Sequence, residues 1–216
     1  LSGNITDGDN TYNITKTGDG ILVLSNTTNS YDGTTTISAG TLTVTGTLDS
    51  GTYSANIINN SAFIYNSSSA QTLSGVISGT GTLTKNGSST LTLSGTNTYS
   101  GATTISAGTL EVDGTLAQTA VTVASGATYD VDATDTVLSI AGAGTIDLTN
   151  AALTAGDGND LEFSGVFNGA NDFTKVGDGV LTLSGNNSSA SYTGRIIIDA
   201  GTISVAADTN LGAAPG

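Results

Sequence analysis

One phrase of about thirty residues is written three times along this chain of 216 residues. The middle copy reads KNGSSTLTLSGTNTYSGATTISAGTLEV at 85–112, and copies with some drift occupy 16–44 and 175–205. A repeat of this size is too short to enclose a core of its own, so its copies stack on their neighbours. The phrase therefore predicts a solenoid or array in which sequence neighbours are also spatial neighbours.

Each copy keeps the same order of elements. A strand-like segment ends in a Lys-x-Gly turn, and an alternating strand follows (ILVLS, TLTLS or VLTLS). A polar loop then ends in Tyr-x-Gly, and two further short strands flank an Ala-Gly-Thr turn. These strands alternate β-branched or apolar residues with polar ones, and no segment shows the apolar spacing of an amphipathic helix. The order predicts an all-β fold.

Three short strands per turn of roughly 20–25 residues are typical of a parallel β-helix, whereas a β-sandwich pairs its strands antiparallel. At that turn length, residues 1–216 form a single array of roughly ten rungs, a rod of about 45–50 Å at the ~4.8 Å strand spacing. We expect the clear copies to span about 1–46, 73–114 and 163–207, with diverged rungs between them. Since aromatic residues make up only 5%, we expect a thin core of Val, Ile and Leu, with Thr, Ser and Asn outside.

The residue types present exclude several kinds of chemistry. With 18 acidic and 4 basic residues, the net charge of −14 excludes a nucleic-acid binder and an anionic membrane surface as a docking site. The chain has no Cys and no His, which removes Ser-His-Asp and cysteine nucleophiles and zinc sites built from these ligands. No apolar run is long enough to insert into a bilayer. We expect no enzyme activity and no cofactor.

Three motifs follow one another in the middle copy: Gly-x-Gly-x-Leu-x-Lys-x-Gly, Leu-x-Leu-Ser-Gly-x-Asn-x-Tyr-x-Gly and Thr-Ile-x-Ala-Gly-Thr-Leu. In this order they resemble the passenger-associated transport repeat of bacterial autotransporters, which are type V secreted proteins. The first copy departs from the pattern at Ser25-Asn26, where the family has Ser-Gly. The third copy has an insertion before Tyr192 that lengthens the Asn-x-Tyr spacing.

This resemblance implies a right-handed β-helical passenger stalk at the bacterial cell surface or outside the cell. It also implies tethering through an outer-membrane barrel that this segment does not include, so we expect a fragment of a longer passenger. Such passengers often serve adhesion, autoaggregation or biofilm formation, with other copies of the chain or host proteins and glycans as partners. The alternative is a polysaccharide-processing or glycan-binding β-helix, because β-helices also host pectin-degrading enzymes.

The best single metal-binding motif is AGDGNDLEF at 155–163, which is close to the calcium-binding nonapeptide. Calcium there needs stacked consecutive nonapeptides, and this chain has one. We therefore expect Asp157 and Asp160 to be turn residues, and calcium binding by them is left open. Asp is well suited to turns because its side chain bonds local backbone. Glu111 and Glu162 are the only glutamates, and they form no evident pair for a glycosidase.

The recurring lysines and tyrosines are interpreted as structural. We expect each lysine stem to cover an apolar rung while its ammonium group stays in water; the alternative is a basic line along one edge. We expect each tyrosine to pack over loop backbone; the alternative is a sugar contact. The Thr-x-Thr pieces suggest an ice-binding surface as a further alternative, but the uneven spacing of the copies argues against it. The residues concerned are Lys16, Lys85 and Lys175, and Tyr31, Tyr99 and Tyr192.

Overall fold

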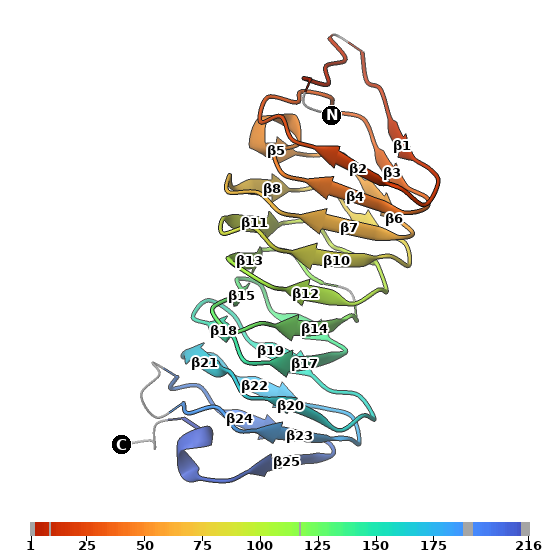
Figure 1. Cartoon of the computed structure of the whole chain (residues 1–216). Helices are drawn as coiled ribbons and strands as arrows, with labels where there is room; N and C mark the ends of the chain where they lie inside the picture. The colour runs from red at the N-terminus through yellow and green to blue at the C-terminus, as the bar shows by residue number, and fades with distance from the viewer. Residues whose placement is uncertain (1–2, 9, 117, 188–191, 213–216) are drawn as a thin grey trace.

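The computed structural model describes residues 3–8, 10–116, 118–187 and 192–212. The chain winds into a parallel β-solenoid of about nine rungs, each rung being one turn of the solenoid. The first and last described rungs lie at opposite ends of a rod (Figure 1). The predicted all-β solenoid is thus confirmed, with about nine rungs against the ten or so expected; right-handedness stays a prediction. The described residues contain no α-helix with the length and hydrophobicity that a bilayer crossing requires.

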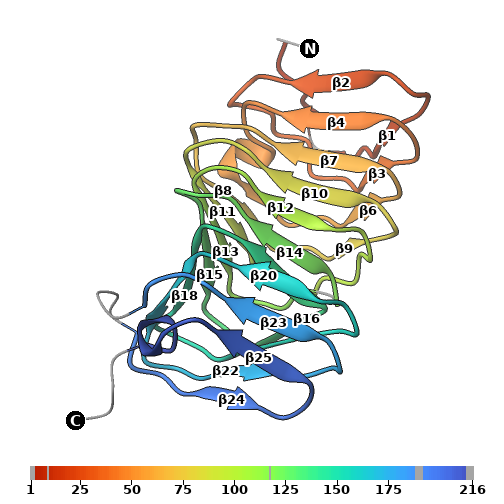
Figure 2. The same cartoon turned by 60° about the horizontal axis from the view of Figure 1, so that its bottom comes forward.

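One face of the rod is a sheet of ten parallel strands that runs its whole length (Figure 2). We call it the long face. Its strands are β2 (Ile21–Leu24), β4 (Thr41–Val44), β7 (Ala62–Tyr65), β10 (Thr82–Lys85), β12 (Thr103–Ile105), β14 (Ala120–Val123), β17 (Ser139–Gly142), β20 (Leu161–Phe163), β23 (Val180–Leu183) and β25 (Thr202–Val205).

A second sheet has seven strands. We call it the acidic face because Glu111, Asp130 and Asp147 lie side by side on three of its strands. Its strands are β5 (Thr52–Tyr53), β8 (Gln71–Leu73), β11 (Thr90–Leu93), β13 (Thr109–Val112), β15 (Thr128–Val131), β18 (Thr145–Leu148) and β21 (Val166–Gly169). Two short 3-10 turns, Asp49–Gly51 and Asp208–Asn210, complete the regular structure of the described chain.

The third face, the split face, consists of two four-stranded sheets with a gap between them. Both sheets hold the same place in the chain's circuit, directly before a strand of the long face. The first contains β1 (Ile14–Lys16), β3 (Thr35–Ile37), β6 (Ile57–Asn59) and β9 (Ile77–Ser78), and the second contains β16 (Asp135–Val137), β19 (Leu153–Ala155), β22 (Phe173–Lys175) and β24 (Ile196–Ile198).

Alternate residues of each strand point into the rod, as the period-2 pattern predicts. In β11, Leu91 and Leu93 are buried while Thr90 and Thr92 are half-exposed. The core differs from the expected Val, Ile and Leu lining, because all four Phe and six of the seven Tyr are buried in it. Near the C-terminal end, the ring centroid of Phe167 lies 4.9 Å from that of Phe173 and 5.4 Å from that of Tyr192. Large rings fill the space between three faces that shorter side chains would leave open.

The three copies do not occupy the same faces. Within each copy, the first strand pairs with the third and the second with the fourth, so one copy builds the same corner on two consecutive rungs. Copies one and three build the corner between the split and long faces, with β1–β4 and β22–β25. Copy two, β10–β13, builds the corner between the long and acidic faces. Its polar loop therefore interrupts the split face, whereas the loops of copies one and three lie beyond the two ends of the acidic face.

Candidate functional site

The repeat lysines are buried at the corners. Lys85 ends β10 and has no exposed surface, and its ammonium group donates to the carbonyl oxygens of Gly87 and, at 3.0 Å, Ala107. Gly87 lies in the corner of the same rung and Ala107 in the corner of the next one. An ammonium group has three N–H donors and can satisfy several carbonyls that a tight corner turns inward. Burial lowers the pKa of Lys85 to about 8.

Lys16 makes the same contact between rungs, and Lys175 bonds carbonyl oxygens of its own corner. Lys16 Nζ donates to the carbonyl oxygens of Gly18 at 2.7 Å and Ala39 at 3.1 Å, and Lys175 Nζ donates to that of Gly177 at 2.7 Å. The prediction that these ammonium groups stay in water was wrong. The alternative of a basic line was also wrong, because all three lysines are buried and Lys85 lies on a different corner from Lys16 and Lys175.

The glycine of each Ala-Gly-Thr turn explains why lysine and glycine recur together. Gly108 has φ +67°, a left-handed conformation that side chains rarely adopt. A Cβ atom built there would lie 2.5 Å from the carbonyl oxygens of Gly87 and Ser89 and 2.7 Å from Lys85 Nζ. Gly201 likewise has φ +73°, and its Cβ would lie 2.8 Å from Lys175 Nζ. The glycine thus leaves the space in which the lysine reaches the next rung.

The loop asparagine of each copy connects three rungs. Asn97 Oδ1 accepts from the backbone N–H of Ile77 at 2.9 Å, and its Nδ2 donates to the carbonyl oxygens of Gly95 and Thr115, both at 3.0 Å. Asn29 makes the equivalent bonds to Ile5 and Thr47 in copy one. These buried asparagines depart from the expected outward position. The side chain bonds backbone groups that the missing strand would have paired.

Asn187 plays this part in copy three. Its Oδ1 accepts from the backbone N–H of Phe167 at 2.7 Å, and its Nδ2 donates to the carbonyl oxygen of Asn210 at 2.6 Å. The insertion between Asn187 and Tyr192 thus leaves these bonds in place, although residues 188–191 lie outside the described residues.

The tyrosines of the Tyr-x-Gly motifs point into the core. Tyr31 and Tyr99 are buried, and their hydroxyl groups form hydrogen bonds to Thr35 Oγ1 at 3.0 Å and Thr103 Oγ1 at 2.7 Å. Tyr192 is buried and donates to the carbonyl oxygen of Arg195 at 2.9 Å. The prediction that these rings lie over the loop backbone was therefore wrong, and a sugar cannot reach them.

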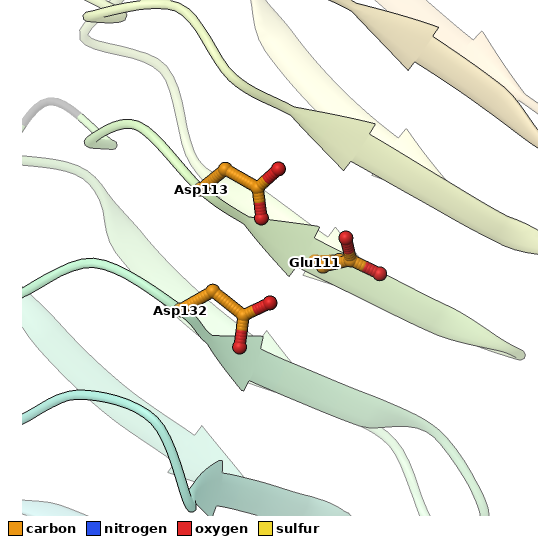
Figure 3. Close-up of side chains that lie close together, drawn as sticks. All are labelled: Glu111, Asp113 and Asp132. Atoms are coloured by element: carbon orange, nitrogen blue, oxygen red, sulfur yellow. The ribbon is translucent and has the colours of Figure 1, made fainter.

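A column of carboxylates runs across three rungs of the acidic face. Glu111, Asp130 and Asp147 lie side by side in register on β13, β15 and β18. Asp113 and Asp132 follow the same strands, and the carboxylates of Glu111, Asp113 and Asp132 lie within 4.8 Å of one another (Figure 3). Like charges directly opposite on neighbouring strands destabilise a sheet.

No basic side chain neutralises this column. Within the described ranges the one ion pair joins Arg195 and Asp172, and the lysines are held at the corners. Burial, together with the charges of Asp132, Asp147 and Glu111, raises the pKa of Asp130 to about 6. The pKa of Glu111 is also raised, first by burial and then by Asp113 and Asp132. Carboxylate oxygens in this arrangement are ligands of the kind that hard cations such as Ca²⁺ take.

The comparisons with known proteins identify the repeats. The model of the passenger-associated-transport-repeat family matches residues 14–44, 83–112 and 173–205, which contain the three lysine corners. The chain is an autotransporter passenger-type β-helix. Such repeats are typical of autotransporter passenger domains and suggest a secreted or surface-exposed protein. Comparison with curated proteins and with solved structures found no significant match.

The passenger's Asp157 and Asp160 have the turn role that was expected of them. Asp157 accepts from the backbone N–H of Asn159 at 2.9 Å and from its side-chain amide at 2.7 Å. Asp160 Oδ1 accepts from the backbone N–H of Val180, on the next rung, at 2.9 Å. A shallow hollow, open to solvent, lies beside Asp157 and Asn159 and encloses a volume of only about 10 Å³. This is far below the roughly 300–1,000 Å³ of the usual small-molecule pocket.

Sequence reasoning named Glu111 but missed the column of the passenger that contains it. The sequence signal is a pair of acidic residues separated by one apolar residue. It occurs as EVD, which begins at Glu111, and again as DVD, which begins at Asp130. Only the register of the rungs shows that these motifs are neighbours, because the strands between them pass around the other faces. Glu162, the second glutamate, lies on the long face and accepts from Ser184 Oγ at 2.6 Å.

Proposed function

We propose that this passenger segment is a non-enzymatic stalk at the bacterial surface. It holds the rest of the passenger away from the cell and displays it there, and it acts in adhesion, autoaggregation or biofilm formation. The observation that carries the proposal is the use of the repeat's polar side chains for stacking. Lys85, Asn97 and Tyr99 are all buried, and each is hydrogen-bonded within the rod. Groups that are fully engaged inside the rod are not free for chemistry on a substrate.

The proposed stalk role fits the physics of a solenoid. Each rung contacts mainly its two neighbours, so length is gained by adding rungs and stability grows with the number of interfaces. About nine rungs at ~4.8 Å span roughly 40 Å. Export through an outer-membrane barrel and tethering to it are part of this proposal.

The test is deletion from the displayed protein. Bacteria that display the passenger with and without residues 1–216 are compared for settling of the culture, biofilm mass and adhesion to host cells. Surface labelling of a tag at the passenger end controls for export. Loss of clumping or adhesion at equal surface display supports the stalk role. Unchanged behaviour in all three assays would show that the segment does not serve adhesion.

A second candidate, a glycan-processing or glycan-binding β-helix, is favoured by the carboxylates of Glu111, Asp113 and Asp132 alone. Glycosidases use two carboxyl groups on either side of the scissile bond. These three carboxylates instead lie on one sheet surface (Figure 3). A screen of acidic polysaccharides with and without calcium decides between the two functions. Turnover or binding that disappears in Glu111→Gln would favour the glycan function.

A further inference from the structure

The gap in the split face spans two rungs, in which the loop between β11 and β12 and the loop between β13 and β14 stand in place of strands. We call these two loops the joint. One buried side chain closes each end of it: Asn97 accepts the backbone N–H of Ile77 in β9 at 2.9 Å, and Asp135 in β16 accepts that of Leu116 in the joint at 3.0 Å. We propose that Asp135 makes this joint sensitive to pH, so that it is tight in mild acid and opens more readily at neutral pH.

Elsewhere in the rod the same bond is made by neutral amides. In the part of the chain that the structure describes, four buried amide side chains accept a backbone N–H from the rung before their own, and they are Asn29, Gln71, Asn97 and Asn187. An amide does not ionise, whereas Asp135 makes the bond with a carboxyl group, which does. The acceptor at this end of the joint can therefore gain and lose a charge.

The hydrogen bonds of Asp135 suit its charged form. Its Oδ2 accepts from the backbone N–H of Leu116 and, at 2.9 Å, from the hydroxyl group of Tyr129, and its Oδ1 accepts from the backbone N–H of Thr136 at 2.8 Å. All three partners are donors, as a carboxylate requires. Asp135 is nevertheless only 2% exposed, and a charge that is removed from water to this extent is costly unless an opposite charge compensates it.

The surroundings of Asp135 supply no such compensation. Within the described ranges no lysine or arginine forms an ion pair with it. The titratable groups that face it are Tyr129, from β15, and Tyr99, from the joint, and burial raises the pKa of both, so they stay neutral. On β19 the residue in register with Asp135 is Leu153. Asp130 follows Tyr129 in β15 and points out of the rod, since successive residues of a strand alternate in direction.

The direction of the pH response follows from proton uptake. Burial raises the pKa of Asp135 above its ordinary value of 3.8, and the hydrogen bonds from Leu116, Tyr129 and Thr136 lower it by less. When the joint opens, water reaches the carboxyl group and its pKa returns toward 3.8. Between the two pKa values, the closed joint holds a proton that the open joint releases, so rising pH favours opening. The stabilisation of the closed joint is complete below pH 3.8 and is lost as pH rises through the raised pKa.

Opening of the joint affects one side of the rod. The sheets of the long face and the acidic face run past it without a break, whereas the split face is divided there into two four-stranded sheets. Loss of the bond between Asp135 and Leu116 therefore loosens the third side while the other two stay paired, and a rod held on two of its three sides can bend. The same chain would be a stiffer rod in mild acid than at neutral pH.

Hydrogen exchange of single backbone amides, followed by NMR on the whole chain, tests this. The protection factor of the Leu116 N–H is divided by that of the Ile77 N–H, whose acceptor is the neutral Asn97, and this removes the pH dependence that global unfolding gives to both. We expect the ratio to fall at least about threefold from pH 4 to pH 7, and by no more than about tenfold for each pH unit. A ratio that does not change with pH would overturn the proposal.

Two matched variants assign the effect to this carboxyl group. Asp135→Asn places at the joint the kind of amide that the other loops use, and the ratio should become independent of pH. Asp160→Asn is the control, because Asp160 also accepts a backbone N–H from a neighbouring rung but is exposed to solvent, and here the ratio should vary with pH as in the wild type. A ratio that still varies in Asp135→Asn, or that becomes constant in Asp160→Asn, would show that another group is responsible.

The carboxyl carbon resonance of Asp135 gives a second measurement, which needs no variant. It should titrate above pH 3.8, and Tyr129→Phe, which removes a donor to the charged form, should move the titration higher still. A wild-type resonance that titrates at or below pH 3.8 would refute the proposal even where Asp135→Asn fails to fold.

Discussion

Replacing Asp130 with Asn should stabilise this protein at neutral pH, although the substitution removes a charge and adds no contact. Asp130 lies between Glu111 and Asp147 on the acidic face, and its pKa is raised to about 6 from a model-compound value near 3.8. A shift of about two pKa units corresponds to roughly 3 kcal/mol between the protonated and charged forms. Because Asp130 is only partly buried, solvent screens much of this, and about 1–2 kcal/mol is the expected gain.

The sign of the pH dependence follows from proton uptake. Between the unfolded pKa near 3.8 and the folded pKa near 6, the folded protein holds a proton at Asp130 that the unfolded chain releases. The stability contribution of this group therefore falls as pH rises through that window and is lowest above it. Asn cannot titrate, so the advantage of Asp130→Asn should be largest above pH 7 and should vanish near pH 4.

Thermal unfolding followed by circular dichroism at several pH values measures this difference. A gain of 1–2 kcal/mol should raise Tm by about 3–6 °C for a chain of this size. Asp178→Asn, at an exposed turn position outside the carboxylate column, is the matched control and should change Tm little. High salt should shrink the gain because it screens the repulsion. A gain that is independent of pH, or shared equally by Asp178→Asn, would refute repulsion in the column as its cause.

Three further substitutions test the repeat corner and loop by urea unfolding. Lys85→Met should cost about 2–4 kcal/mol, because it leaves buried carbonyls without donors, whereas Arg195→Gln should change stability little because its ion pair is exposed; equal losses would contradict the buried-lysine explanation. Gly108→Ala should cost several kcal/mol, and Gly126→Ala, which has a similar positive φ but open space around it, only about 1–2 kcal/mol. Asn97→Ala should cost about 1–3 kcal/mol, chiefly through the Ile77 N–H that it leaves unpaired, because the carbonyl oxygens of Gly95 and Thr115 keep backbone donors; a loss below about 0.5 kcal/mol would show that water replaces the side chain.

The strands were predictable from the sequence because their signal is local. Alternation in TLTLS identified β11, and the equivalent segments identified β2 and β23, since a two-residue period is all that a half-buried strand requires. The repeated order of strands then indicated a parallel solenoid. The predicted number of rungs, roughly ten, came close to the nine or so of the structure, because three short strands and three corners set the length of each turn.

The lysine environment was not predictable, because it depends on a residue far along the chain. Lys85 sits in a polar, glycine-rich segment that reads as exposed, and its burial follows only when Ala107 arrives from the next rung. The carboxylate column was missed for a related reason. The intervals from Glu111 to Asp130 and from Asp130 to Asp147 differ by two residues, so no fixed period reveals the register. Contacts between rungs are non-local even in so regular a fold.

The displacement of copy two by one face affects how such a rod can change during evolution. The repeated unit is a corner that spans two rungs, and nothing in its contacts fixes it to a particular face. Inserting or removing one strand upstream would therefore rotate every later loop to a neighbouring side while keeping the stacking inside each copy. The side of the rod on which a loop emerges is thus decided by the length of chain before it. A short insertion far from a binding loop could turn that loop toward a new partner without altering a single residue in it.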